Sequence, residues 1–291
     1  MHFAIRYLTE YQYDAPVTDN LNALRVRPAT TSTQRCDEFH TRIDPEARVT
    51  RHLDYFGTEV IEFGVPGVHD HLTIDVRARV VTSAPAEPPE GLWKTLVDSP
   101  YVDAAGEFAL GWQDQPAIAG LQELEAAIEA QTPLRTLERL CEVIPERFEY
   151  RAGVTYVGSG IEDLLEQGAG VCQDFVHISL ALLRRRGIAA RYVSGYLWAA
   201  PHDNDGDSLV VDTHAWLEAL LPGDDADGEP VWVGADPTNR KLADDTHVKI
   251  GHGRFYADVP PVKGLYMGGA NSELSAAVTL SRLDPQASAR A

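Results

Sequence analysis

Residues 168–186 read GAGVCQDFVHISLALLRRR, a glycine loop followed by a cysteine, an apolar run and three arginines. Gly168 and Gly170 do not continue a helix cheaply, so a helix is expected to begin just after them. Apolar residues then recur at helical spacing: Phe175, Ile178, Leu182 and Leu183. Arginines in a last turn, with Gly187 just beyond it, are typical of a helix end. The stretch predicts a buried helix whose first turn carries Cys172, where unpaired backbone N–H groups and the helix dipole stabilise a thiolate.

A cysteine nucleophile needs a base, and the base needs a group that orients it. Residues 212–221, DTHAWLEALL, predict a strand with His214 near its start. Residues 231–239, VWVGADPTN, predict a shorter strand that ends at Asp236, because Pro237 cannot donate to a sheet ladder. The chain order is therefore a cysteine at a helix start, a histidine on a strand and an aspartate at a strand end.

The segments GVCQDFVH, GIAARYVSGY, THAWLEALLPG and WVGADPTN together resemble the transglutaminase-like cysteine enzymes. The resemblance implies an α+β fold with a papain-like core, in which the nucleophile helix packs on an antiparallel β-sheet. Carried over residue by residue, it assigns Cys172 as the nucleophile, His214 as the base and Asp236 as the group that orients the base. It leaves the reaction open, because members of this superfamily cross-link glutamine to amines, hydrolyse amide bonds or have lost activity.

Residues 1–83 carry several short strand patterns, and these predict a β-rich, sandwich-like domain before the core. Within them YQYDAPV, LRVRP, DYFGTEV and HDHLTIDVRARV resemble the N-terminal domain of a bacterial transglutaminase-like subfamily. Three prolines in residues 84–90 indicate a linker, which opens a linker and covering segment at 84–117. The catalytic core is then expected at 118–283 and a tail at 284–291.

The composition limits the partners of the chain. A net charge of −19 repels nucleic acid and anionic membranes, and no segment approaches the ~18 apolar residues of a membrane span. The N-terminal residues MHFAIRY enter a strand pattern without the apolar core of a signal peptide. We therefore expect a cytoplasmic protein that binds neither nucleic acid nor membrane. A peptide or protein amide as its substrate is what the family resemblance implies. The sequence leaves the oligomeric state open.

We expect no metal and no cofactor. The three cysteines, Cys36, Cys141 and Cys172, are too few for a disulfide framework, and no two of them have the spacing of zinc ligands. His69 and His71 could share one face of a strand but lack an evident third ligand. Another acidic stretch resembles a calcium loop only faintly, since an EF-hand needs a glutamate at its twelfth position, and it is expected to be solvated: Asp203, Asp205 and Asp207.

The residues around the triad predict acyl transfer from an amide through a thioester, with the backbone N–H of Cys172 as one oxyanion donor. Candidate substrate-binding residues are Gln173, Trp216 and Tyr256, the last within a segment at 251–264 that also resembles the family. His177 is expected to pack rather than to react, because five residues after Cys172 correspond to about 500° of helical turn.

The predicted site is compatible with three functions. Release by water makes a peptidase or amidase, release by a primary amine makes a protein-glutamine gamma-glutamyltransferase, and an inert cleft makes a peptide-binding module. Hydrolysis is favoured, because the polar loops at 199–208 and 222–230 indicate an open, wet cleft. Trp198 and Trp216 could instead form part of the aromatic wall that amine transfer needs. An intact triad argues against the binding module.

Overall fold

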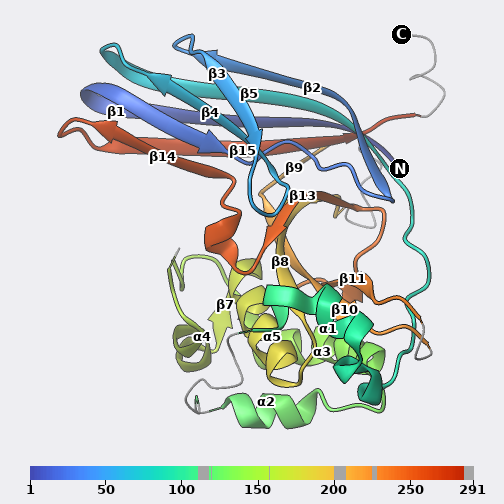
Figure 1. Cartoon of the computed structure of the whole chain (residues 1–291). Coiled ribbons are helices and arrows are strands. Elements are labelled where there is room, and N and C mark those ends of the chain that lie inside the picture. The colour runs from blue at the N-terminus through green and yellow to red at the C-terminus, as the bar shows by residue number, and fades with distance from the viewer. Residues whose placement is uncertain (111–117, 119, 157, 200–207, 225–227, 285–291) are drawn as a thin grey trace.

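The computed structural model describes residues 1–110, 118, 120–156, 158–199, 208–224 and 228–284. It has a β-sandwich stacked on an α+β core, with the sandwich uppermost in Figure 1. The acidic stretch at Asp203, Asp205 and Asp207 lies outside the described residues, as do most of the loop at 199–208 and the tail from residue 285 onward. Among the described helices, none is both long and apolar enough to cross a membrane.

The β-sandwich is organised by one long strand, β1 (His2–Leu24). The first part of β1 pairs with β5 and β15, and its last part pairs with β4 and β14, so the strand passes from one sheet layer to the other. The remaining strands of this eight-stranded sheet are β2 (Gln34–Asp44), β3 (Val49–Leu53), β4 (Glu59–Val65), β5 (His69–Thr82), β9 (Ser208–Val211), β14 (Val262–Met267) and β15 (Ser272–Arg282). The β-rich N-terminal region is thus confirmed.

The sandwich also takes strands from the C-terminal part of the chain. β9, β14 and β15 come from within 118–283, the range predicted for the core, yet β14 and β15 hydrogen-bond to β1. The physical reason is that β1 needs partners along both of its edges, and β15 supplies a continuous ladder from Phe3 to Tyr13. A local strand pattern does not reveal such a distant partner.

The core is a five-stranded antiparallel sheet covered by helices. Its strand order is β12-β11-β10-β8-β13, with bounds β8 (Ala190–Leu197), β10 (His214–Leu221), β11 (Val231–Asp236), β12 (Lys241–Leu242) and β13 (His247–Gly253). The helices are α1 (Ser99–Ala105), α2 (Leu121–Ala127), α3 (Pro133–Arg147), α4 (Ile161–Gln167) and α5 (Cys172–Arg185). α5 packs on β8 and β10 through one shared hydrophobic cluster (Figure 1). The α+β fold, with the cysteine helix on an antiparallel sheet, is confirmed.

The sandwich docks on the core through aromatic contacts at the end of β8 and through Val248 and Ile250 of β13. The rings of Phe3 and Trp198 lie 5.8 Å apart between centroids, and those of Tyr7 and Tyr196 lie 6.5 Å apart. The Tyr196 hydroxyl also donates to the carbonyl of Val26 at 3.2 Å. Both Tyr196 and Trp198 belong to the hydrophobic cluster of the sandwich, so the two layers share one buried interface.

This interface predicts the behaviour of a truncated chain. A fragment of residues 91–291 is expected to be less soluble than the whole chain, because truncation exposes Tyr196 and Trp198 and leaves β14 and β15 without β1. The measurement compares soluble yield and sedimentation of the two proteins under the same conditions. A fully soluble, monomeric fragment with the thermal stability of the whole chain would show that docking buries little.

Candidate active site

Cys172 is half-buried and is the first residue of α5. At this helix end the N–H groups of Asp174 and Phe175 bond to the carbonyl of Val171, while the Asp174 carboxylate accepts the N–H of Val171 at 2.8 Å. Gly170 precedes this turn because a Cβ there would lie 2.7 Å from Asp174 Oδ2. The Thr155 hydroxyl donates to the same carboxylate oxygen at 2.6 Å. The helix start is therefore held in place directly beside the thiol.

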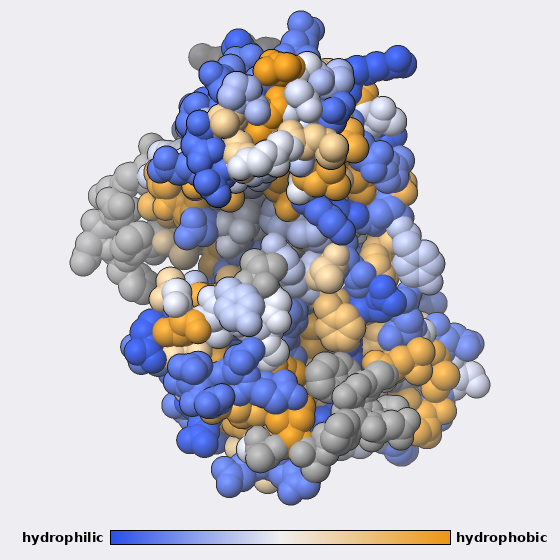
Figure 2. All heavy atoms as spheres, turned by 90° about the vertical axis from the view of Figure 1, so that its left-hand side faces the viewer, coloured by the Kyte–Doolittle hydropathy of each residue, from blue (hydrophilic) through white to orange (hydrophobic). Residues whose placement is uncertain are grey.

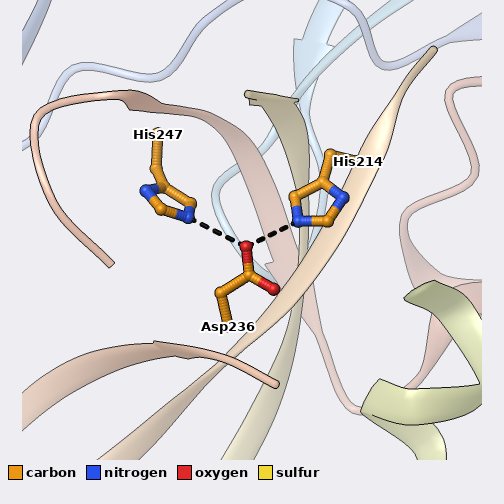
Figure 3. Close-up of side chains that lie close together, drawn as sticks. All are labelled: His214, Asp236 and His247. Atoms are coloured by element: carbon orange, nitrogen blue, oxygen red, sulfur yellow. Dashed lines mark hydrogen bonds and ion pairs between the residues drawn. The ribbon is translucent and has the colours of Figure 1, made fainter. Parts of the chain in front are cut away.

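His214 and Asp236 come together at the ends of two neighbouring strands, β10 and β11. His214 Nε2 lies 2.8 Å from Asp236 Oδ2, and the Asp236 side chain is fully buried (Figure 3). Cys172 lies close enough to His214 to contribute to the raised pKa of its imidazole, and since Nε2 is engaged by Asp236, Nδ1 is the ring nitrogen left for the thiol. The structure thus brings all three predicted triad residues together.

The pKa of His214 is set by opposing effects. Burial lowers it, but the hydrogen bonds to Asp236 and to Cys172 outweigh burial and raise it from 6.5 to about 9. The pKa of Asp236 falls below its usual range, because hydrogen bonds from His214 and His247 outweigh the opposing effect of burial. At neutral pH this arrangement favours an imidazolium at His214, held by the carboxylate of Asp236.

Asp236 also shapes the turn that follows it. Its Oδ1 accepts the N–H groups of Thr238 at 3.0 Å and Asn239 at 3.1 Å, and its Oδ2 accepts the Asn239 amide at 2.7 Å. The Asp-Pro-Thr-Asn segment therefore forms a turn, and the same aspartate also holds His214. A buried carboxylate with this many donors is rigidly oriented toward His214.

The sequence did not reveal two neighbours of the triad, His247 and Tyr150. His247, at the start of β13, places Nε2 3.1 Å from Asp236 Oδ2 and Nδ1 3.1 Å from Asp244 Oδ1 (Figure 3). Tyr150, in the short strand β6 (Glu149–Tyr150), is 56% exposed as a whole, yet partial burial of its hydroxyl and the neighbouring Cys172 raise its pKa to about 12. For His247 no local signal exists, whereas Tyr150 lies in the F-E-Y segment before the cysteine helix.

The predicted substrate-binding residues lie at different depths. Gln173 is half-buried beside Cys172, and Tyr256 is half-buried at the start of the short helix η3 (Tyr256–Asp258). Trp216 is only 2% exposed, and its ring lies against those of His214 and His247, with centroids 6.1 and 5.2 Å away. His177 accepts the N–H of Tyr256 at 3.3 Å through Nε2, and burial lowers its pKa to about 4.

One group of side chains has the chemistry of metal ligands. The donor atoms of His214, Asp236 and His247 lie within 4.8 Å of one another, and two imidazoles with a carboxylate can hold zinc. The same atoms are already engaged in hydrogen bonds of 2.8 and 3.1 Å, which account for their approach without an ion.

The hydrogen bonds predict that chelation does not change any amide turnover by this protein. Turnover after dialysis against EDTA is expected to match that of the untreated protein, since the imidazoles are held by Asp236 itself. Addition of excess zinc is expected to inhibit, because a metal would take the base that Cys172 needs. Loss of turnover in EDTA, with recovery on adding one particular metal, would contradict the prediction.

Two family models match this chain. Residues 3–81 match the bacterial transglutaminase-like N-terminal region, and residues 122–237, which include the three triad residues, match the transglutaminase-like superfamily. An uncharacterised protein of Mycobacterium leprae is 31% identical over 278 residues, which span 94% of this chain and 96% of that protein. The chain belongs to the transglutaminase-like superfamily.

Two further relatives of this transglutaminase-like protein extend the comparison. An uncharacterised protein of Mycobacterium tuberculosis is 33% identical over 291 residues, covering 95% of this chain and 91% of its own length. A crystal structure of a “Putative Cysteine Protease” from Cytophaga hutchinsonii superimposes with a TM-score of 0.71 at 21% identity, covering 98% of this chain and 92% of that chain. At this identity the structural likeness establishes the shared fold of the sandwich and the core.

Proposed function

We propose that this protein is a cysteine-dependent enzyme that cleaves amide bonds through a thioester, with water as its principal acceptor. The observation that carries the proposal is that His214 is hydrogen-bonded to the fully buried Asp236 carboxylate and lies beside Cys172, which begins helix α5. A helix N-terminus favours the thiolate, and a buried carboxylate favours the imidazolium. These are the two charged forms that acyl transfer from an amide requires.

In the proposed reaction the Cys172 thiolate attacks the amide carbonyl, and a tetrahedral oxyanion forms. The backbone N–H of Cys172 is one donor to that oxyanion, and the Tyr150 hydroxyl, which lies against the thiol, is the second donor we propose. His214 transfers its Nδ1 proton to the departing amine, which leaves a thioester and a neutral imidazole. His214 then takes a proton from water, the resulting hydroxide attacks the thioester, and the carboxylic acid and the thiolate are released.

Water is favoured over an amine because the tryptophans near the site are buried. Trp216 is 2% exposed behind the imidazoles, and Trp198 is 7% exposed beneath Phe3. Neither side chain offers the exposed aromatic surface that a dry acceptor tunnel would need. Water at ~55 M then competes for the thioester in most turnovers.

The test supplies a glutaminyl peptide together with a labelled primary amine at millimolar concentration. We expect deamidated or cleaved peptide to exceed the amine adduct, as read by mass spectrometry, and the Cys172→Ala variant to yield neither product. Adduct in large excess would make the protein a transferase with the same triad. Absence of thioester and of both products across a varied peptide set would refute the enzymatic proposal.

A further inference from the structure

A groove lies beside the triad, between the sandwich and the core. It encloses about 300 Å³, and Figure 2 shows the hollow in which the sandwich overhangs the core. Its core side is formed by Thr213, which directly precedes His214, and by Tyr256. Tyr192 lies between this wall and Cys172. Its ring is 6.1 Å from that of Tyr256, and its pKa is raised by burial and, to a smaller extent, by the nearby Cys172.

The floor of the groove is a section of β1 and β15 in which Thr9 is buried while Leu274 and Ala276 of β15 remain exposed. The inner face of these strands is covered at one end by the core, where Tyr7 meets Tyr196, and at the other end by β14, where Tyr13 meets Tyr266 at 4.9 Å. Between these contacts Thr9 pairs with Ala276. Both side chains are small, so they form a depression between the larger side chains that flank them.

Hydroxyl groups converge on this depression. Tyr7, Thr9, Tyr11 and Tyr256 all line it, and burial is the main cause that raises the pKa of each of the three tyrosines. Thr9 is 1% exposed, and among the described residues its Oγ1 makes no hydrogen bond that meets both distance and angle limits. It does lie close enough to the Tyr7 hydroxyl to influence the pKa of that group. Tyr11 and Tyr256 are only half-buried, and hydroxyls both donate and accept, so these two tyrosines can serve the N–H and C=O groups of a peptide.

The remaining side chains that line the groove favour apolar over acidic side chains of a bound peptide. Apolar side chains complete the walls: Pro261, Val262, Leu274, Ala277 and Val278. Among the described residues that line the groove, no lysine, arginine or histidine occurs, and the exposed Asp212 stands at its edge. An acidic side chain entering the groove would therefore meet a like charge and no cation, whereas an apolar side chain would be desolvated against apolar walls.

We propose that this groove binds the substrate segment next to the scissile amide and selects a peptide with apolar and without acidic side chains there. This inference rests on the proposed function for the position of the scissile amide. It also gives the N-terminal region a role in substrate recognition, since β1 supplies most of the hydroxyl groups. The pocket volume is at the lower end for small-ligand sites, which fits a short stretch of an extended peptide rather than a folded partner.

The experiment measures binding in the absence of chemistry, using the full chain with Cys172→Ala. The probes are two fluorescent heptapeptides with a central glutamine and blocked ends, one with leucine and alanine neighbours and the other with glutamate at the same positions. Ala276→Trp is introduced to fill the depression, and Ser275→Trp serves as the matched control, because Ser275 pairs with Glu10 on the opposite face of the sheet. Thermal unfolding of both tryptophan variants verifies that the fold is kept.

We expect the apolar peptide to bind at least about tenfold more tightly than the acidic one, from desolvation and like-charge repulsion. Ala276→Trp is expected to weaken that binding by about tenfold or more, and Ser275→Trp to change it by less than about twofold, since only the first fills the cavity. Equal binding to both tryptophan variants, equal binding of both peptides, or no binding of either would overturn the groove assignment. Binding that depends on Ala276, with no thioester formed by the wild-type protein, would retain the groove and refute the proposed chemistry.

Discussion

Replacement of Cys172 by alanine is expected to abolish thioester formation and to lower turnover of an amide substrate by about 10⁴-fold or more. The reason is that the thiol is the only group at this helix start that His214 can activate as a nucleophile within the described site. The measurement is kcat/KM for the wild-type and Cys172→Ala proteins with one peptide substrate. A variant that keeps a tenth of the wild-type rate would remove Cys172 from the reaction.

The same assignment predicts selective alkylation of the wild-type protein. Iodoacetamide is expected to label Cys172 well before the other two cysteines at neutral pH, because the thiolate is the reactive form. Burial raises the pKa of the Cys141 thiol far above its usual range and also raises that of Cys36, so both stay protonated. Mass spectrometry of timed digests measures the order. Equal labelling of all three cysteines in the folded protein would contradict it.

The helix start and the strand ends of the site were predictable because their signals are local. Glycines before Cys172, helical spacing after it, and Pro237 directly after Asp236 each constrain the backbone within a few residues. The structure places these elements as expected, with α5 beginning at Cys172 and β11 ending at Asp236. At each of these positions a reactive side chain stands where the local sequence fixes the backbone. The three residues of the predicted triad could therefore be assigned from the sequence.

His247 and the C-terminal strands were not predictable because long-range pairing positions them. His247 meets Asp236 only because β13 and β11 belong to the same sheet, and its own segment is an ordinary strand pattern. β15 likewise pairs with β1 from the opposite end of the chain. The depth of Trp198 has the same origin, since Phe3 covers it. Register between distant strands depends on the packed whole and leaves no trace in a window of ten residues.

The second large effect is expected for Asp236→Asn. Turnover should fall by about 10³- to 10⁴-fold, because a neutral amide no longer favours the imidazolium that Cys172 needs. Stability should fall by about 3 kcal/mol near pH 6, as when one partner is removed from a buried ion pair. The measurements are kcat/KM, the pH dependence of iodoacetamide labelling at Cys172, and chemical unfolding.

The pH dependence of the stability loss follows from the two partners of the pair. The pKa of His214 is raised from 6.5 to about 9, so its contribution is complete below about pH 6.5 and disappears as the pH rises through about 9. The pKa of Asp236 is lowered from 3.8, so its contribution is present above that pH and is lost on acidification below it. The difference between wild type and Asp236→Asn should therefore be largest between about pH 4 and 6.5 and should shrink above pH 9.

A pair of variants at His247 separates orientation of Asp236 from mere packing. His247→Gln keeps an N–H donor for Asp236 Oδ2 and is expected to retain labelling of Cys172 within about tenfold of wild type, whereas His247→Leu fills similar space without a donor and should lose more. Because Asp236 holds His214, losing this donor should also move the pH profile of labelling toward that of Asp236→Asn. Identical pH profiles of labelling for His247→Gln and His247→Leu would mean that His247 supports only the fold. For Asp236→Asn, a stability difference from wild type that does not change with pH would mean that the carboxylate does not control the charge on His214.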